Sequence, residues 1–231
     1  MAQVFLYDTT LRDGAQMEGI SYSVEDKLRI LRRLDDLGVH YIEGGWPGAN
    51  PRDSEFFQRA KSLRLTHAQL AAFASTRRAY ARAEDDPTIR ALEEAHTTVC
   101  TLVGKSWDLH VTRVLETTLE ENLNMIADSV RYLKGRGRTV FFDAEHFFDG
   151  FKADADYALQ CLRAAAEAGA DCLVLCDTNG GAITSDVTSI VQRVASEFSV
   201  PLGIHVHNDC ELAVANSIAA IVAGAVQVQG T

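Results

Sequence analysis

Two histidines that are one residue apart, His205 and His207, form the pattern in this sequence with the clearest chemical potential. In a β-strand, residues i and i+2 point to the same face, so the two imidazoles would lie side by side. Two neutral imidazoles and a carboxylate from elsewhere in the chain make a divalent-metal site with open coordination positions. For an isolated HxH pattern, two hydrogen-bonded core histidines are the alternative. Asn208 and Asp209 follow at the polar end of the strand and favour the metal site.

The segment Arg12-Asp13-Gly14 offers the groups that such a site lacks. Asp13 could supply the carboxylate ligand. Arg12 carries a rigid fork of N–H donors that suits the carboxylate of a substrate. Gly14 allows the backbone to turn tightly. Taken alone, this tripeptide would be an ordinary solvated turn in most proteins.

Short apolar runs alternate with helical patterns along the whole chain. Most runs have few polar residues on either face, as expected for parallel strands that are covered on both sides. The predicted strands are 4–8, 39–44, 70–75, 98–104, 139–145, 172–177, 202–208 and 226–230. The main helical patterns are 23–38, 53–63, 118–137, 154–169, 184–198 and 211–224.

This order of elements predicts an α/β protein, a (β/α)8 TIM barrel, because eight strand candidates alternate with about seven helices. The first helix has clear boundaries: Ser23 is a plausible N-cap with Asp26 three residues later, and Gly38 ends it. An open doubly wound sheet is the alternative. Neither GxGxxG nor GxxxxGK[S/T] follows the first strand, which disfavours that alternative.

Polar residues occur at nearly every predicted strand end, where barrel enzymes collect their active-site groups. Solubility alone does not explain this density. Glu145 and Asp177 could each be a base, an orienter of a metal-bound histidine, or a strand-end cap. The rim positions are 8–16, Glu43, 75–76, 104–108, 145–146, 177–181 and 205–209.

The overall composition and charge of the chain indicate which kinds of binding partner to expect. The 231 residues are 47% hydrophobic and 23% charged, with a formal net charge of −10, which disfavours binding to nucleic acid or to an anionic membrane. The N-terminal residues show no export signal, and no apolar run is long enough to span a bilayer. Five cysteines without a CxxC pair predict reduced thiols in a cytoplasmic protein.

The block LYDTTLRDGAQ, together with HVHND near the end, resembles the DRE-TIM metallolyase family, and the resemblance extends over the entire chain. The segments IEGGWPGANPRD, GKSWDLHVT, TLEENLNMIADSV, VFFDAEHFFDGF and LCDTNGG are most similar to the citramalate synthase and isopropylmalate synthase branch. The resemblance implies an acyltransferase of isoleucine or leucine biosynthesis. It would condense acetyl-CoA with a 2-oxo acid, with pyruvate giving citramalate as the expected case.

The resemblance also implies roles for individual residues. The ligands of a divalent metal (Zn, Mn, Co or Mg) would be Asp13, His205 and His207. Arg12 would contact the 2-oxo acid and stabilise the developing alkoxide. Glu145 matches a residue that lines the 2-oxo-acid pocket, and it is our own candidate for the catalytic base. The other substrate-binding candidates are Gln16, Glu43, His110, Asp143 and Thr178. Asp143 departs from the family pattern, because other branches have a larger or uncharged residue there.

Residues 1–231 are expected to form a single catalytic barrel domain. The family normally continues beyond the VQGT segment with a further metal-site asparagine, a last helix and an accessory regulatory region. We therefore expect exposed apolar surface on the last strand and on the neighbouring helices, and a homodimer for the full-length enzyme. A metal-dependent carbon–carbon lyase or aldolase of the same family, and a non-catalytic metal-binding barrel, are the alternatives.

Overall fold

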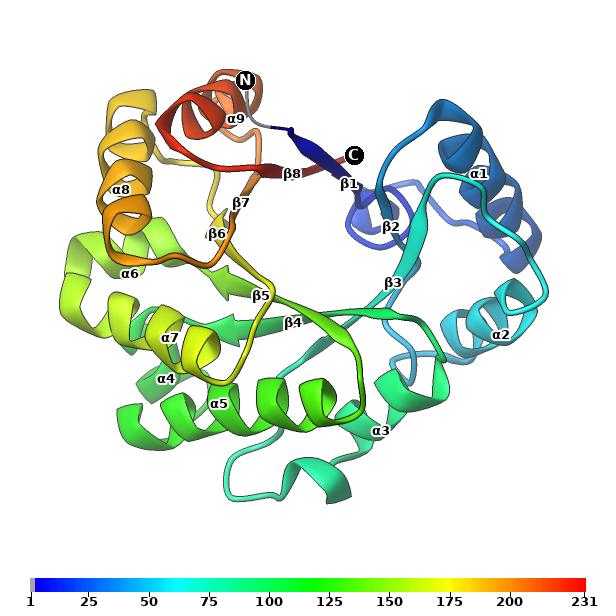
Figure 1. Ribbon diagram of the computed structural model, residues 1–231, viewed down its shortest axis with the longest axis horizontal. Helices are drawn as coiled ribbons and strands as arrows, with labels where there is room; N and C mark the ends of the chain where they lie inside the picture. The colour runs from blue at the N-terminus through cyan, green and yellow to red at the C-terminus, as the bar shows by residue number, and fades with distance from the viewer. Residues whose placement is uncertain (1–2) are drawn as a thin grey trace.

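The computed structural model describes residues 3–231, in which eight parallel strands close into a barrel with β8 beside β1 (Figure 1). Each strand also pairs with the next one along the chain, so the predicted (β/α)8 fold is confirmed. The strands are β1 (Phe5–Asp8), β2 (Tyr41–Glu43), β3 (Gln69–Ser75), β4 (Val99–Lys105), β5 (Thr139–Glu145), β6 (Cys172–Asp177), β7 (Leu202–Val206) and β8 (Gln227–Gly230).

Helices lie around the outside of this barrel, in the connections between successive strands. In the described residues they are α1 (Val24–Leu37), α2 (Pro51–Ala60), α3 (Pro87–Glu94), α4 (Asp108–Arg113), α5 (Leu119–Gly135), α6 (Phe147–Ala153), α7 (Ala155–Glu167), α8 (Thr184–Glu197) and α9 (Ala213–Ala223). None of the helices in residues 3–231 combines the length and the apolar character needed to cross a bilayer.

The sequence patterns missed three of these helices. Helices α3, α4 and α6 have only six to eight residues each. A segment of about two turns is too short to show a reliable hydrophobic period. The longer α1 follows the sequence closely, because Ser23 and Asp26 form the reciprocal capping box and Gly38 ends the helix at a φ of +86°.

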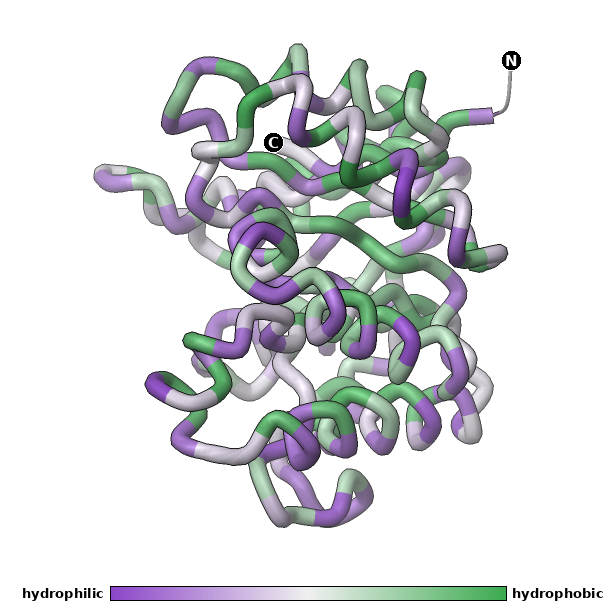
Figure 2. The backbone as a smooth tube through the Cα atoms, turned by 90° about the vertical axis from the view of Figure 1, so that its left-hand side faces the viewer, coloured by the Kyte–Doolittle hydropathy of each residue, from purple (hydrophilic) through white to green (hydrophobic). Residues whose placement is uncertain are grey.

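Buried apolar side chains form two clusters that the barrel wall separates. The larger cluster lies between strands and helices, and Leu31, Phe56 and Ile126 belong to it. The smaller one fills the barrel interior and includes Tyr7 and Phe141. Successive residues of a strand face opposite sides, so strands β3 to β6 contribute to both clusters. Figure 2 shows the resulting apolar strands in the middle of the molecule and the mixed polarity of the outer helices.

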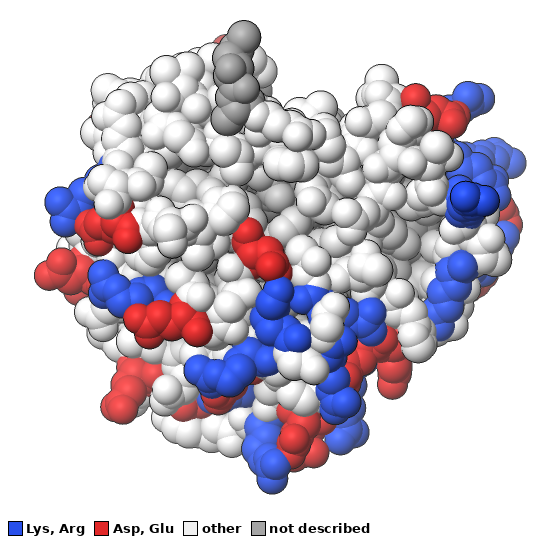
Figure 3. Space-filling model, in the orientation of Figure 1, with Lys and Arg blue, Asp and Glu red and all other residues white. Residues whose placement is uncertain are grey.

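One side of the barrel carries an exposed apolar surface, as expected. In Figure 1, α9 and α1 flank β8 and β1, and no helix of the described residues lies over these two strands. Val214, Ile218 and Val222, four residues apart on α9, are exposed, and so is Leu6. A groove of about 600 Å³ runs between α9 and β8. Figure 3 shows few charged side chains over this part of the molecule.

Candidate metal centre and active site

Three potential metal ligands meet at the rim of the barrel. Asp13 Oδ2 lies 3.2 Å from His205 Nε2 and 3.8 Å from His207 Nε2. The two imidazole nitrogens are 3.3 Å apart, and the ligand atoms of all three residues lie within 4.8 Å of one another. A two-histidine, one-carboxylate set at these distances fits a divalent ion such as Zn, Mn or Co.

Two strand ends position these ligands. His205 lies in β7, and His207 directly follows the strand, where its N–H donates to the carbonyl of Asp177 at 3.2 Å. Asp13 lies in the turn after β1. The carbonyl of Thr9 accepts hydrogen bonds from the N–H groups of three successive residues, 12–14, at 2.8–3.1 Å, and thereby fixes this turn. Only β8 separates β1 from β7, so barrel closure brings the carboxylate to the imidazoles.

The electrostatics of the ligand set favour a bound cation. Burial raises the pKa of Asp13, but the hydrogen bond from His205 and the charge of Arg12 outweigh it, so that the pKa is about 2. Burial lowers the pKa of His205, whereas Asp13 and Asp143 raise it, and the net direction is upward. The Asp13 carboxylate is therefore ionised at neutral pH, the form that coordinates a metal.

Arg12 lies beside the ligands, with its guanidinium held from several directions. Its Nε donates to the Glu43 carboxylate, its Nη1 donates to Asp13 Oδ1 at 3.3 Å, and its Cζ lies 4.0 Å from the centre of the Phe73 ring. Burial lowers the pKa of Arg12, but the charges of Glu43 and Asp13 raise it by more than burial lowers it. The side chain therefore stays charged. Its Nη2 has no hydrogen bond to residues 3–231 and is available to an anionic ligand.

A cavity of about 240 Å³ opens at this centre, a size that suits a small molecule. Eight of the ten predicted site residues line it: Arg12, Asp13, Gln16, Asp143, Glu145, Thr178, His205 and His207. Within this group, the Glu145 carboxylate pairs with Lys105, and Thr178 Oγ1 accepts a hydrogen bond from the N–H of His146 at 2.9 Å. The rim therefore brings anionic, cationic and neutral polar groups to one small space.

Glu43 lies beneath the cavity instead of lining it. Its side chain is fully buried, and it accepts hydrogen bonds from Arg12 and, at 2.6 Å, from the hydroxyl of Tyr7. Both carboxylate oxygens are thus engaged within the protein. This placement favours a role in holding Arg12 over direct contact with a substrate.

His110 also lies outside the residues that line the cavity. Its ring packs against Trp107, with 4.8 Å between ring centroids, and edge-to-face against His146 at 4.3 Å. Burial and the charges of His146 and Lys105 lower the pKa of His110. A neutral imidazole packed under the rim can support the β4–α4 loop without touching the ligand.

Asp143 is a buried acid on the inner face of β5. Burial and the charge of Glu43 raise its pKa to about 7. Its Oδ1 accepts a hydrogen bond from Gln229 Nε2 at 3.1 Å. In the folded protein this carboxyl therefore holds a proton at pH values where an exposed aspartic acid has lost it.

Replacing Asp143 with asparagine is expected to flatten the pH dependence of stability in the metal-free protein. The raised pKa means that the folded chain binds more protons than the unfolded chain between about pH 4 and 7, so the free energy of unfolding falls as pH rises through that window. One pKa unit corresponds to about 1.4 kcal/mol, so the loss is at most about 4 kcal/mol. Urea unfolding at pH 5 and pH 8 measures it, with the exposed Asp36→Asn as the control. If the free energy of unfolding changed equally between pH 5 and pH 8 in D143N and in the unsubstituted chain, the expectation would be contradicted.

A second cavity, of about 460 Å³, adjoins the first and shares Trp46, Val103 and Glu145 with it. Residues 75–79 form part of its wall. Within residues 3–231, Glu145 is the one ionisable side chain that lines both cavities.

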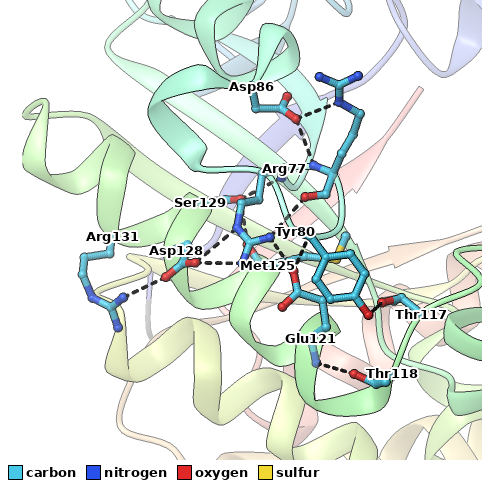
Figure 4. Close-up of polar contacts among 11 residues, drawn as sticks. Arg77, Tyr80, Asp86, Thr117, Thr118, Glu121, Met125, Asp128, Ser129 and Arg131 are labelled. Carbon is cyan, nitrogen blue, oxygen red and sulfur yellow. Dashed lines mark hydrogen bonds and ion pairs between the residues drawn. The ribbon is translucent and has the colours of Figure 1, made fainter.

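Buried Arg77 ties the loop that follows β3 to helix α5 (Figure 4). Its Nη1 donates to Glu121 at 2.7 Å and its Nη2 to Asp128 at 2.8 Å, while its backbone N–H donates to Ser129 Oγ at 2.8 Å. Next to it, Arg78 donates to the buried carboxylate of Asp86. These bonds hold the wall of the second cavity in one position.

Several residues at the site were not among those predicted from the sequence. Trp46, Phe73, Val103 and Cys176 also line the first cavity, and Gln229 contacts His205 beneath it. Phe73 and Val103 could have been inferred from strand alternation. The VQVQG segment held a signal for Gln229, since its alternating amides interrupt an apolar strand.

The chain is similar in sequence to proteins that are named as synthases. It is 57% identical to (R)-citramalate synthase of Aquifex aeolicus over 99% of its length, and 55% identical to the Geobacter sulfurreducens enzyme of that name over its full length. It is 36% identical to 2-isopropylmalate synthase of Methanocaldococcus jannaschii over 99% of its length. The chain spans 44% of the length of both citramalate synthases and 42% of the isopropylmalate synthase.

Solved structures show the same fold. Hydroxymethylglutaryl-CoA lyase from Pseudomonas aeruginosa matches with a TM-score of 0.82 at 20% identity, over 99% of this chain and 76% of that one. The Bacillus subtilis HMG-CoA lyase matches with a TM-score of 0.81 at 19% identity, over the same shares of the two chains. The sequence model of the HMGL-like family matches residues 3–231, and the chain belongs to that family.

Proposed function

We propose that this barrel is the catalytic domain of an acyltransferase that condenses acetyl-CoA with a 2-oxo acid, with pyruvate giving citramalate. The supporting observation is that relatives named (R)-citramalate synthase are more than 50% identical to nearly the whole chain. The Asp13, His205 and His207 ligand set agrees with this proposal. The chain covers less than half of these relatives, so the activity is proposed for a protein with this barrel as one domain.

The 240 Å³ cavity is the proposed site of the 2-oxo acid. A divalent ion held by Asp13, His205 and His207 would supply Lewis-acid polarisation of its carbonyl group. Arg12 would donate from Nη2 to the carbonyl oxygen, a hydrogen bond that strengthens as negative charge develops there. Because Glu43 and Phe73 already hold the guanidinium, this donor needs little reorganisation when the reaction proceeds.

The larger cavity is the proposed site of the thioester, and Glu145, at the junction of the two cavities, is the candidate base. The Glu145 carboxylate would take a proton from the methyl group of acetyl-CoA. The electron pair left on that carbon forms the bond to the carbonyl carbon of the 2-oxo acid, and the carbonyl π bond breaks. The resulting alkoxide takes a proton from water, and Glu145 returns its proton to water. Water hydrolyses the thioester, and free CoA leaves. Lys105, paired with Glu145, positions the carboxylate at the junction.

The state of the cysteines supports a proposal about the cellular compartment. Four of the five cysteines are buried and all five are unpaired, which supports a reducing compartment such as the cytoplasm. Residues 1–231 are proposed to act as one barrel domain. The homodimer that the family resemblance implies stays a prediction.

A panel of 2-oxo acids with acetyl-CoA tests the proposed reaction. It uses a protein extended past residue 231 to the length of the relatives, loaded with Zn²⁺ or Mn²⁺. We expect CoA release that depends on both substrates, fastest with pyruvate. Cleavage of a hydroxyacyl-CoA without any condensation would instead support the lyase alternative. Metal binding without turnover in the extended protein would support a non-catalytic barrel.

A further inference from the structure

A buried amide on β8, Gln229, directly contacts one of the proposed metal ligands. The parallel register of β7 and β8 pairs His205 with Gln229, so their side chains lie next to each other inside the barrel. His205 Nδ1 is 2.9 Å from Gln229 Oε1, and Gln229 is 2% exposed. The opposite ring nitrogen, Nε2, is the one that faces Asp13 and His207.

The surroundings of Gln229 fix which way its amide points. Its Nε2 donates to Asp143 Oδ1 at 3.1 Å and to Gln227 Oε1 at 3.3 Å. Reversing the amide would put its oxygen against these two acceptors and its NH2 group against the imidazole. When Asp143 is ionised, the reversed amide would therefore replace two hydrogen bonds with contacts between oxygen atoms, which is costly in a buried place.

This orientation has a consequence for the imidazole. An amide oxygen only accepts hydrogen bonds, so Nδ1 of His205 must carry a proton to make the 2.9 Å bond. In a neutral imidazole the lone pair is then on Nε2, the atom that faces the other ligands. Histidine ligands of metals generally have such a partner on their second nitrogen, and it sets the tautomer and the ring orientation.

We propose that Gln229 is a positioning residue of the metal centre: with Asp143 it forms a relay that holds His205 in the tautomer able to bind a divalent cation. The proposal rests on the ligand set of the proposed function, but not on which reaction follows. In this relay Asp143 orients the amide, and the amide orients the imidazole.

The first test replaces Gln229 with leucine and measures Zn²⁺ affinity of the purified chain by competition with a chromophoric chelator. We expect affinity to fall about 10- to 100-fold, as is typical when the partner of a ligating histidine is removed. The matched control is Asn216→Leu, which removes a buried amide that bonds to Ala182 and Thr184 and does not line the cavity at the metal ligands. Unchanged affinity in Q229L would overturn the proposal.

The second test exchanges the groups of the relay. In the double variant Asp143→Asn/Gln229→Glu, the new carboxylate still accepts from His205 Nδ1, and the new amide can donate to it. We expect Zn²⁺ affinity within a few-fold of the original chain. A folded double variant that binds as weakly as Q229L would contradict the relay, and the double variant decides the matter if Q229L does not fold.

The third measurement is the hydrogen bond at Nδ1 itself, by ¹H–¹⁵N NMR of the chain with Zn²⁺ bound, so that Nδ1 carries the ring proton. Slow exchange of that proton with water is expected in the original chain and in the double variant, and faster exchange in Q229L. Equal exchange rates in all three would refute the proposal. None of these measurements involves turnover, so they stand apart from the test of the condensation.

Discussion

Replacing His205 with alanine is expected to weaken Zn²⁺ binding by this chain on the order of 1000-fold. The imidazole is one of three ligand groups within 4.8 Å of one another, and removal of an outer-shell partner alone typically costs roughly 10- to 100-fold. Asp13 would lose its 3.2 Å contact with the ring at the same time. Competition with a chelator of known affinity measures the change.

The control for this substitution is His67→Ala, because His67 is exposed and its side chain is not part of the site. We expect H67A to bind Zn²⁺ as the original chain does. A loss in H205A that is no larger than in H67A would show that the metal binds elsewhere. In the extended protein, H205A should abolish CoA release if the proposed reaction is correct.

Replacing Arg12 with lysine is expected to lower kcat of the extended protein by roughly 100- to 1000-fold, the usual effect of losing one donor to a developing oxyanion. A lysine keeps the positive charge beside Glu43. It cannot donate to Glu43 and Asp13 and also present a further N–H to the cavity in a fixed plane. Steady-state kinetics with pyruvate and acetyl-CoA provide the measurement.

The control for R12K is Arg59→Lys, an exposed arginine whose partners are Glu25 and Glu55. We expect normal kcat in R59K and normal Zn²⁺ affinity in both variants. If R12K retained its kcat and lost only substrate affinity, Arg12 would bind the ground state and the transition state equally. The proposed role in stabilising the alkoxide would then be wrong.

The barrel could be predicted from local sequence because its elements have clear periods and ends. The structure places β5 and β6 at the predicted residues, 139–145 and 172–177. Both are mainly apolar, as β-strands that are covered on two sides require. The short helices α3, α4 and α6 escaped prediction, since one or two turns leave no periodic pattern.

The candidate site could be predicted in part for a related reason. Strand ends mark the rim, and alternation tells which residues point inward, so eight of the ten predicted residues line the cavity. Glu43 does point inward, yet Arg12 lies between it and the cavity. Whether an inward-pointing group can reach a ligand depends on the way in which long side chains cover one another. The hydrophobic periodicity of the sequence carries no information on this.

By itself, the sequence determined the succession of strands and helices, the HxH pair on one strand face and the family to which the chain belongs. Only the tertiary structure decided that Asp13 meets His205 and His207, because closure of β8 against β1 brings the two ends of the chain together. It also decided that Gln229 contacts His205, through the register of β7 and β8. Hydrogen bonds between distant residues depend on that register, whereas apolar alternation depends only on neighbours in the chain.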